Sequence, residues 1–256
     1  MLTTALAIKL GLLCVAGFIA AFVDSIAGGG GLISLPAFLM AGIPPYFALG
    51  TNKFSATAAS CTSSIKYIKS GKANFELLKY LIPFTAVGAF LGASTVLAIK
   101  QEYLQAMVLV MILAVGIYSL FSKTMGTEDR FTGFTKRNIL YGILLAFGIG
   151  FYDGFFGPGT GSFLIFGMIG IYGFDFIQAG GNARVLNFVS NVTSLIRFAI
   201  QGKVYLVFGV PVAISMIIGA RMGTKFALKN GAKVVKPIFV TMSLAVAAKM
   251  LYSLIW

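Results

Sequence analysis

A succession of long apolar runs is the feature that most limits what this chain can fold into. Runs of roughly 20 residues, each long enough to cross a bilayer as a helix, follow one another with short polar connections. The runs cover about 5–27, 45–69, 76–99, 102–122, 138–156, 174–201, 204–228 and 232–255. Because lipid offers no partner for backbone polar groups, we expect an all-α polytopic membrane protein with about eight transmembrane helices.

Composition supports this class and excludes others. Apolar residues make up 58% of the 256 residues, and only 11% are charged, whereas soluble domains carry roughly 25% charged residues. An ordinary soluble enzyme, a disordered chain and a nucleic-acid binder are therefore excluded. The net charge of +13 is typical of Lys and Arg at the cytoplasmic ends of membrane helices. The chain has no His, and Cys14 and Cys61 lie inside apolar runs, so we expect no metal and no cofactor.

The two halves of the chain resemble each other. A Phe-x-Asp segment with a glycine-rich run recurs at an offset of 129 residues, and later matches recur at 130 and 131. The matched segments are 22–30 with 151–159, 50–52 with 180–182, and 62–67 with 193–198. Such drift is expected of duplication followed by short insertions. We predict a first membrane repeat over 1–122, a polar linker over 123–137 and a second repeat over 138–256, with parallel and inverted relationships both open.

Each repeat contains a glycine-rich break followed by a short apolar piece. The pieces 32–40 and 162–171 are too short to span a bilayer, so each is expected to form a re-entrant or half helix. Interrupted segments at corresponding positions of two halves are the best sequence indication of a transporter binding site. Helices that start after the breaks would aim free N–H groups at an anion. The alternative is that these glycines only permit close helix packing.

Basic connections give a partial orientation. On an eight-span count, the second-to-third connection, the central linker and the sixth-to-seventh connection lie with both termini, which would be cytoplasmic. The seventh-to-eighth connection disagrees, because it also carries four lysines, at 225, 229, 233 and 236. A miscounted crossing near a glycine-rich break would explain the disagreement.

Four ionisable residues lie inside apolar segments, where charge is costly and usually functional: Asp24, Lys53, Asp153 and Arg184. The two cations, one from each half, would clamp an anion near the pseudo-symmetry axis. Alternatively, they pair with the two aspartates and hold the halves together. The sequence favours neither reading, and both can hold at different steps of a transport cycle.

Polar residues follow both cations at helical spacing. Asn187, Asn191 and Ser194 share one face with Arg184, and the first half repeats the pattern; there Asn52, Ser55 and Thr62 share a face. These faces predict a wet pathway lining, with interhelical hydrogen bonding as the alternative. The Gly-x-x-x-Gly pairs at 88/92 and 219/223 are interpreted as helix packing faces.

The glycine-rich segments resemble a known family. The segment 24–36, followed by 48–53, closely resembles the sulfite exporter TauE/SafE family of membrane transporters, and 153–161 with 185–191 resembles its second half. The resemblance covers nearly the whole chain. It implies an inner-membrane protein of about eight spans from duplicated halves, and transport of a small sulfur-containing anion such as sulfite or an organosulfonate such as sulfoacetate.

We therefore expect a multi-pass transporter in the inner membrane, not an enzyme, that moves a small anionic substrate. An anion channel of the same architecture is the first alternative, and a membrane enzyme or assembly factor for a sulfur compound is the second. Besides membrane lipid, a coupling proton or ion and a second copy of the chain in a homodimer are open as partners. The predicted substrate-binding residues are Gly28, Gly29, Gly30, Gly31, Asn52, Lys53, Gly157, Gly159, Thr160, Gly161, Asn182, Arg184, Asn187 and Asn191. Asp24 or Asp153 is expected to carry a coupling proton, because a carboxylate is easier to protonate in a low-dielectric site.

Overall fold

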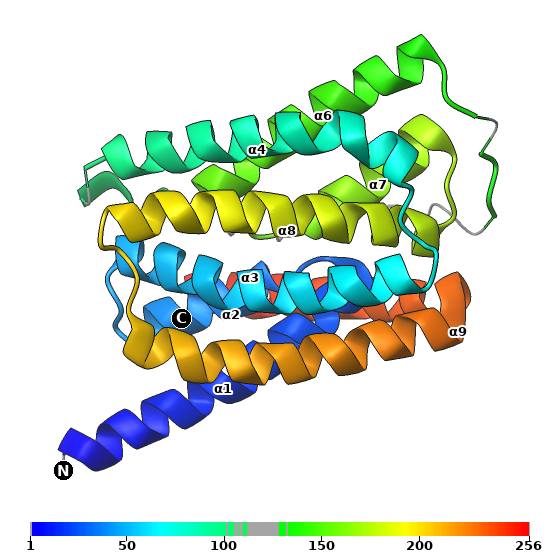
Figure 1. Cartoon of the computed structure of the whole chain (residues 1–256). Coiled ribbons are helices and arrows are strands. Elements are labelled where there is room, and N and C mark those ends of the chain that lie inside the picture. The colour runs from blue at the N-terminus through cyan, green and yellow to red at the C-terminus, as the bar shows by residue number, and fades with distance from the viewer. Residues whose placement is uncertain are drawn as a thin grey trace.

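A computed structural model describes residues 2–100, 102–104, 107, 110–111, 128–131 and 133–255, with the backbone alone for 2–3, 5 and 231–255. Throughout this part of the chain every regular element is an α-helix (Figure 1). The helices are α1 (Leu2–Ala27), α2 (Gly31–Met40), α3 (Pro45–Lys69), α4 (Phe75–Ala98), α6 (Lys136–Phe155), α7 (Thr160–Tyr172), α8 (Phe176–Ile200) and α9 (Leu206–Ile255).

Four of these helices are long and apolar enough to cross a membrane. They include the stretches Leu6–Ala27 in α1, Phe75–Ala98 in α4, Lys136–Phe155 in α6 and Leu206–Asn230 in α9. The all-α membrane class is thus confirmed, whereas the eight spans remain a prediction. The predicted run 102–122 and linker 123–137 fall largely outside the described residues.

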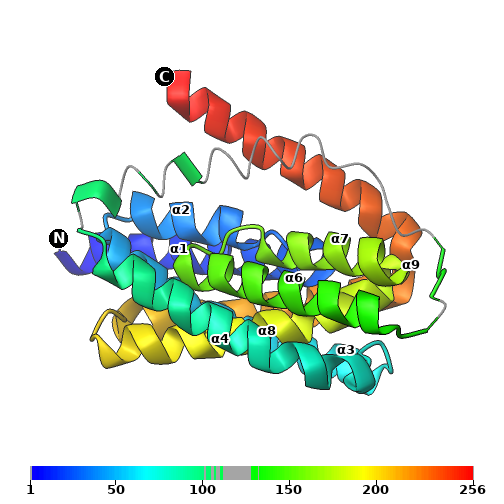
Figure 2. The same ribbon diagram turned by 90° about the horizontal axis from the view of Figure 1, so that it is seen from above.

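The last two predicted runs lie in one continuous helical element, but the chain changes direction between them. α9 continues through the expected break at 229–231, and Figure 2 shows its C-terminal part turning back over the bundle. The polar pair Asn230 and Gly231 does not end the helix, because one interior glycine costs only about 1 kcal/mol relative to alanine.

Local sequence explains where several helices begin. Pro45 occupies the first turn of α3, where its missing N–H is not needed. The Asn74 side chain accepts a hydrogen bond from Leu77 N at the start of α4, and Asp175 accepts from two backbone N–H groups at the start of α8. These residues satisfy N–H groups that the helices themselves leave free.

The two short helices turn back along their predecessors, as the glycine-rich breaks predicted. The α2 C-terminus returns to the first half of α1, where Lys9 Nζ donates to the Ala41 carbonyl oxygen at 3.2 Å. The α7 C-terminus likewise returns to the start of α6, because Tyr172 lies against Gly142. Neither pair of helices therefore carries the chain from one end of the bundle to the other.

α3 and α8 pack against each other in opposite directions at the centre of the bundle (Figure 1). The start of α3 meets the α8–α9 connection, where Thr51 Oγ1 accepts from Tyr205 N at 2.9 Å. The start of α8 meets the α3–α4 connection, where Asn182 Oδ1 accepts from Asn74 N at 2.8 Å. The two contacts correspond to each other, because residue 182 lies 131 positions after residue 51, and residue 205 lies 131 positions after residue 74. Each contact joins the central helix of one half to the connection that follows the central helix of the other half.

This antiparallel packing corrects the placement of the basic connections. The α3–α4 and α8–α9 connections lie at opposite ends of the bundle, not at the same end. The N-terminal half of α1 lies at the α8–α9 end, because Lys9 contacts the short connection into α3. Lys66 Nζ donates to the Arg221 carbonyl oxygen at 2.7 Å. The basic stretch of α9, which contains Arg221, Lys225 and Lys229, therefore lies at the α3–α4 end. The ends that the simple count assigned to these connections were wrong, because the chain turns back at each glycine-rich break.

The Gly-x-x-x-Gly pairs are confirmed as packing faces. A Cβ at Gly88 or Gly92 of α4 would collide with the α6 backbone, at the Phe147 and Phe151 carbonyl oxygens. The pair at 219 and 223 of α9 meets the carbonyl oxygens of residues 18 and 22 of α1 in the same way. Each repeat's predicted first helix therefore packs on a helix of the other half, and small residues allow the close approach.

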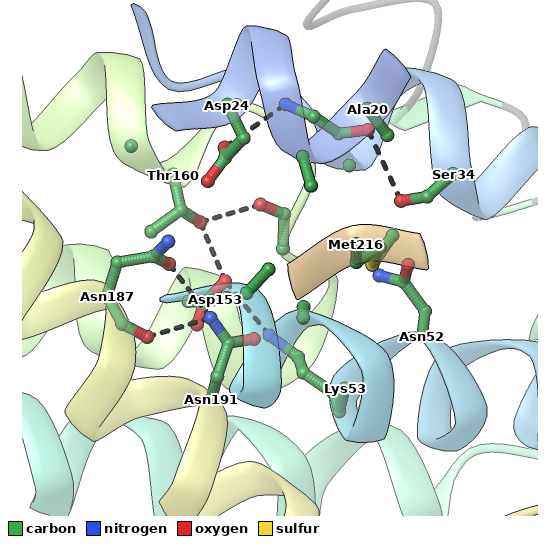
Figure 3. A pocket seen from close by; sticks show the side chains of 18 residues that line it. Ala20, Asp24, Ser34, Asn52, Lys53, Asp153, Thr160, Asn187, Asn191 and Met216 are labelled. Atoms are coloured by element: carbon green, nitrogen blue, oxygen red, sulfur yellow. Dashed lines mark hydrogen bonds and ion pairs between the residues drawn. The ribbon is translucent and has the colours of Figure 1, made fainter. Parts of the chain in front are cut away.

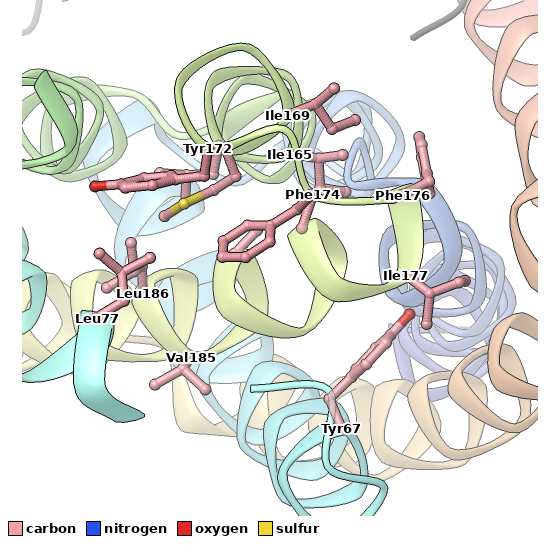
Figure 4. Close-up of a cluster of buried hydrophobic side chains, with 14 of the residues drawn as sticks. Tyr67, Leu77, Ile165, Ile169, Tyr172, Phe174, Phe176, Ile177, Val185 and Leu186 are labelled. Atoms are coloured by element: carbon pink, nitrogen blue, oxygen red, sulfur yellow. The ribbon is translucent and has the colours of Figure 1, made fainter. Parts of the chain in front are cut away.

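Apolar packing encloses the central helices. One cluster of buried side chains joins the C-terminal part of α3 with α4, α7 and α8, and includes Tyr67, Leu77, Ile165 and Leu186 (Figure 4). A second cluster joins α1, α2 and the start of α3, and includes Leu35 and Phe38. Each glycine-rich break joins one cluster to the other, because Ala27 and Leu164 belong to the first cluster and Leu32 and Phe156 to the second.

Candidate functional site

A cavity lies where the two glycine-rich breaks meet α3 and α8 (Figure 3). Its lining comes from α1, α2, α3, α6, α7, α8 and α9, so both halves of the chain contribute to one site. The predicted site residues that line it are Asp24, Gly30, Gly31, Asn52, Lys53, Asp153, Gly157, Gly159, Thr160, Gly161, Asn187 and Asn191.

Four predicted residues lie outside the lining. Arg184 lies behind it, fully buried against Gly161 and Asp24. The Gly28 backbone meets the Gly161 backbone so closely that a Cβ at either position would collide with the other break. Gly29 precedes the lining residues, and Asn182 faces the α3–α4 connection. The glycines at 28 and 161 therefore permit close contact between the two breaks. For these two positions the alternative interpretation, close packing, applies.

The Lys53 ammonium group of α3 pairs with the Asp153 carboxylate of α6. The Lys53 Nζ to Asp153 Oδ1 distance is 2.9 Å, and each side chain is only 3% exposed. Asp153 also accepts hydrogen bonds from Thr160 Oγ1 at 2.9 Å and from Ser190 Oγ. A buried charge needs a partner and further hydrogen bonds to be tolerated, and Asp153 has both.

The Arg184 guanidinium of α8 pairs with the Asp24 carboxylate of α1. The Arg184 Nη1 to Asp24 Oδ2 distance is 2.7 Å; Arg184 is 0% exposed, whereas the Asp24 side chain is 22% exposed. Asp24 Oδ1 accepts from Gly30 N at 3.1 Å. The Arg184 Nε and Nη2 atoms are buried and have no hydrogen-bond partner among the described residues.

Both ion pairs join one half of the chain to the other. Asp24 of the first half binds Arg184 of α8, and Asp153 of the second half binds Lys53 of α3. In this structure the cations therefore pair with the aspartates, which was one of the two readings that the sequence left open. A clamp on an external anion requires at least one pair to open.

The chain's own carboxylates stand at the start of both short helices. Asp24 accepts from the backbone N–H of Gly30, which caps α2. Asp153 accepts from the hydroxyl group of Thr160, the first residue of α7. The residue before it, Gly159, has φ +87°, a conformation that glycine adopts without strain. Each break thus holds a carboxylate oxygen of the chain itself beside the start of its short helix.

The polar faces divide between the cavity and helix contacts. Asn187 and Asn191 line the cavity together with Asn52, whose Oδ1 is buried without a partner in the described residues. Ser55 and Ser64 instead join helices, because they donate to the carbonyl oxygens of residues 209 and 184. Both interpretations of the polar face therefore apply, to different residues.

Sequence reasoning missed Ser190. Its hydroxyl donates to Asp153 Oδ2 across the site. It lies three residues after Asn187, so the helical spacing that selected the asparagines could have found it. The sequence match that paired Asn52 with Asn182 was also one residue out of register, because Thr51 makes the contact equivalent to that of Asn182.

Among the described residues, no group of three or more His, Cys, Asp or Glu side chains could hold a metal ion. The site consists of paired charges, amides and backbone N–H groups, enclosed by apolar helices.

The chain is similar to proteins that are named as membrane transporters. The chain is 38% identical to a probable membrane transporter protein of Haemophilus influenzae, over 96% of this chain and 95% of that protein. It is 36% identical to the probable membrane transporter protein YfcA of Escherichia coli K12, over 95% of this chain and 90% of that protein. No solved structure matches the chain.

The apolar helices, the enclosed site and these relatives define a multi-pass membrane transporter, not an enzyme. Residues 13–250 match the family model described as sulfite exporter TauE/SafE. The chain belongs to this family.

Proposed function

We propose that this transporter moves a small sulfur-containing anion, sulfite or an organosulfonate such as sulfoacetate, across the inner membrane by secondary transport. The observation that carries the proposal is the shared cavity, in which the starts of α2 and α7 and two buried ion pairs meet. Carboxylate oxygens of the chain already occupy both helix starts. An oxyanion offers the same chemistry and can replace one of them.

We further propose that the chain forms about eight spans in two inverted repeats. The antiparallel packing of α3 and α8 supports this, because corresponding contacts recur with the direction reversed and the halves exchanged. Inverted repeats place a substrate site near the middle of the membrane, at the interface between the halves. The cavity occupies that interface in the described part of the chain.

Roles for the lining residues follow from their chemistry. Lys53 and Arg184 supply positive charge, whereas Asn52, Asn187 and Asn191 supply amide groups that orient the oxygen atoms of the anion. The N–H groups at the starts of α2 and α7 complete the site. Sulfite and sulfonate groups carry three oxygen atoms, which several donors from different directions can bind together.

The test is ligand-dependent thermal stability of the purified protein with sulfite, sulfoacetate, methanesulfonate, sulfate, thiosulfate, taurine and acetate. A ligand that binds the native state raises the melting temperature. We expect a shift with at least one of sulfite, sulfoacetate and methanesulfonate. No shift with these three, together with a shift by acetate, would overturn the proposed substrate class.

A matched pair of variants tests the site. Arg184→Gln removes the buried cation beside the cavity, and Arg197→Gln makes the same change farther along α8, where the side chain binds Ser94 Oγ at 2.9 Å. We expect Arg184→Gln to abolish the ligand shift and Arg197→Gln to preserve it.

Flux in liposomes that saturates and shows counterflow supports a transporter, whereas flux that stays linear with concentration indicates a channel.

A further inference from the structure

The charge balance of the cavity restricts what can bind with the anion, if the proposed function is right. The site contains two cations and two carboxylates, joined as two ion pairs whose formal charges sum to zero. An added anion would leave one uncompensated negative charge inside a low-dielectric environment, which is strongly unfavourable. A cation must therefore accompany the anion, or a proton must neutralise one carboxylate.

The two carboxylates differ in what holds them. Asp153 is 3% exposed and binds Lys53, Thr160 and Ser190. Neutralising it would weaken three interactions at once and leave the buried Lys53 without an anionic partner. Asp24 is 22% exposed and lines the cavity. Water in the cavity can deliver a proton to Asp24 with much less loss of bonding.

Protonation of Asp24 also frees a binding group for the anion. Arg184 then loses its carboxylate partner, and its Nε and Nη2 atoms already lack partners among the described residues. Gly161 lines the cavity and lies directly against the guanidinium, since a Cβ at this residue would be only 3.1 Å from Nη1 and 3.3 Å from Nη2. Arg184 can therefore balance either the Asp24 carboxylate or an external oxyanion.

In the described cavity lining, Asp24 and Asp153 are the carboxylates that could accept the proton. The charged or titratable groups that face Asp24 are Arg184 of α8, Tyr67 and Lys53 of α3, and Asp153 of α6. Tyr67 donates its hydroxyl hydrogen to the backbone carbonyl oxygen of residue 25. The cavity lining from α2, α7, α8 and α9 contributes no charged side chain.

We infer that the site binds one monovalent anion together with one proton, that the proton resides on the Asp24 carboxyl group, and that the Lys53–Asp153 pair stays closed during this exchange. The proton comes from the bulk solution and reaches Asp24 through the cavity. It converts the Asp24 carboxylate to a carboxylic acid, and the bound anion takes over the charge of Arg184. The loaded site is then as neutral as the empty one.

The experiment counts protons taken up when methanesulfonate binds to the purified protein in a weakly buffered solution. Methanesulfonate is a monovalent anion of a strong acid and takes up no proton itself at neutral pH. We expect one proton per bound anion, and an affinity that rises about tenfold for each unit of pH decrease while Asp24 is ionised in the empty site. Sulfite and sulfoacetate are measured in parallel, after subtraction of the protons that the reagents exchange without protein. Sulfoacetate carries two negative charges at neutral pH, so the same charge balance predicts one further proton or cation when a dianion binds.

Two variants locate the proton. Asp24→Asn places a neutral group where the carboxylate stood, so we expect proton uptake to vanish and anion affinity to become independent of pH. Glu128→Gln is the control, because this carboxylate pairs with Arg130 at the surface and is 71% exposed; proton uptake should remain.

The outcomes separate the inference from the proposed function. Anion binding by the wild-type protein without proton uptake, or with a requirement for Na⁺, overturns the inference and leaves the proposed function standing. Proton uptake that persists in Asp24→Asn overturns the assignment to Asp24. If sulfite, sulfoacetate and methanesulfonate all fail to bind, the proposed function fails and the inference falls with it. The wild-type proton count decides the coupling even where a variant does not fold.

Discussion

At the scale of single residues, two ion pairs join the halves of the chain inside the protein. Their exposure differs, because the Lys53–Asp153 pair is closed on both sides whereas Asp24 faces the cavity beside the fully buried Arg184. A closed pair whose carboxylate also accepts hydrogen bonds from Thr160 and Ser190 is suited to holding the halves together. A pair with one accessible member is suited to exchange.

Removing one member of the closed pair should strongly destabilise the protein. Lys53→Met leaves the Asp153 carboxylate buried without a cation, which costs about 3–5 kcal/mol in comparable buried pairs. We expect a large drop in melting temperature in detergent, partly restored by the double variant Lys53→Met/Asp153→Leu, which removes both charges.

A surface pair serves as the control for this measurement. Arg130 and Glu128 lie 3.1 Å apart with side chains 79% and 71% exposed, and exposed pairs contribute about 0–1 kcal/mol. Arg130→Met should therefore leave the melting temperature nearly unchanged. If Lys53→Met and Arg130→Met lower the melting temperature equally, burial does not determine how much an ion pair contributes to the stability of this protein.

At the scale of the elements, close glycine contacts join the helices of one half to those of the other. α6 presents Gly150 to α4, where a Cβ would lie 2.6 Å from the Thr85 carbonyl oxygen. The opposite face of α6 presents Gly148, which has no neighbouring atom within 4 Å. The two glycines lie two residues apart, so one helix contains both a packing position and its own control.

Leucine at these two positions should have opposite effects. Gly150→Leu forces α4 and α6 apart, because backbone atoms cannot move aside as a side-chain tip can; we expect loss of folded protein or a strongly lowered melting temperature. Gly148→Leu adds an apolar side chain on an open face and should be tolerated. Size-exclusion profiles and thermal unfolding in detergent compare them. A tolerated Gly150→Leu would contradict the close packing of α4 on α6.

At the scale of the whole molecule, basic residues gather at one end of the bundle. The α3–α4 connection, the start of α6 and the basic stretch of α9 share this end, together with Arg130, which contacts Gly173 at the end of α7. The opposite end, with the α8–α9 connection, has Lys9, Lys100, Arg197 and Lys203. Because Lys and Arg favour the cytoplasmic side, the α3–α4 end should face the cytoplasm, with the start of α1 on the other side.

Cysteine labelling in whole cells tests this orientation. Ser70 and Gln201 are exposed residues that end α3 and α8, so they mark the two ends of the bundle. In a background without the free Cys14 and Cys61, we expect an impermeant maleimide to label Gln201→Cys from outside. Ser70→Cys should react only after permeabilisation. The reverse labelling would place the α3–α4 connection outside.

The sequence by itself determined the membrane class, the two breaks, the short helices after them and most residues that line the cavity. These follow from local chemistry, because hydropathy, glycine runs and charges inside apolar segments are visible without knowing what lies opposite them. Only the tertiary structure decided that Lys53 pairs with Asp153 and that Arg184 lies behind the cavity. It also decided that α3 and α8 run antiparallel, which places the α8–α9 connection at the opposite end from the α3–α4 connection, and it placed the basic stretch of α9 at the same end as that connection. Pairing and direction depend on contacts between residues more than a hundred positions apart, and no local pattern specifies them.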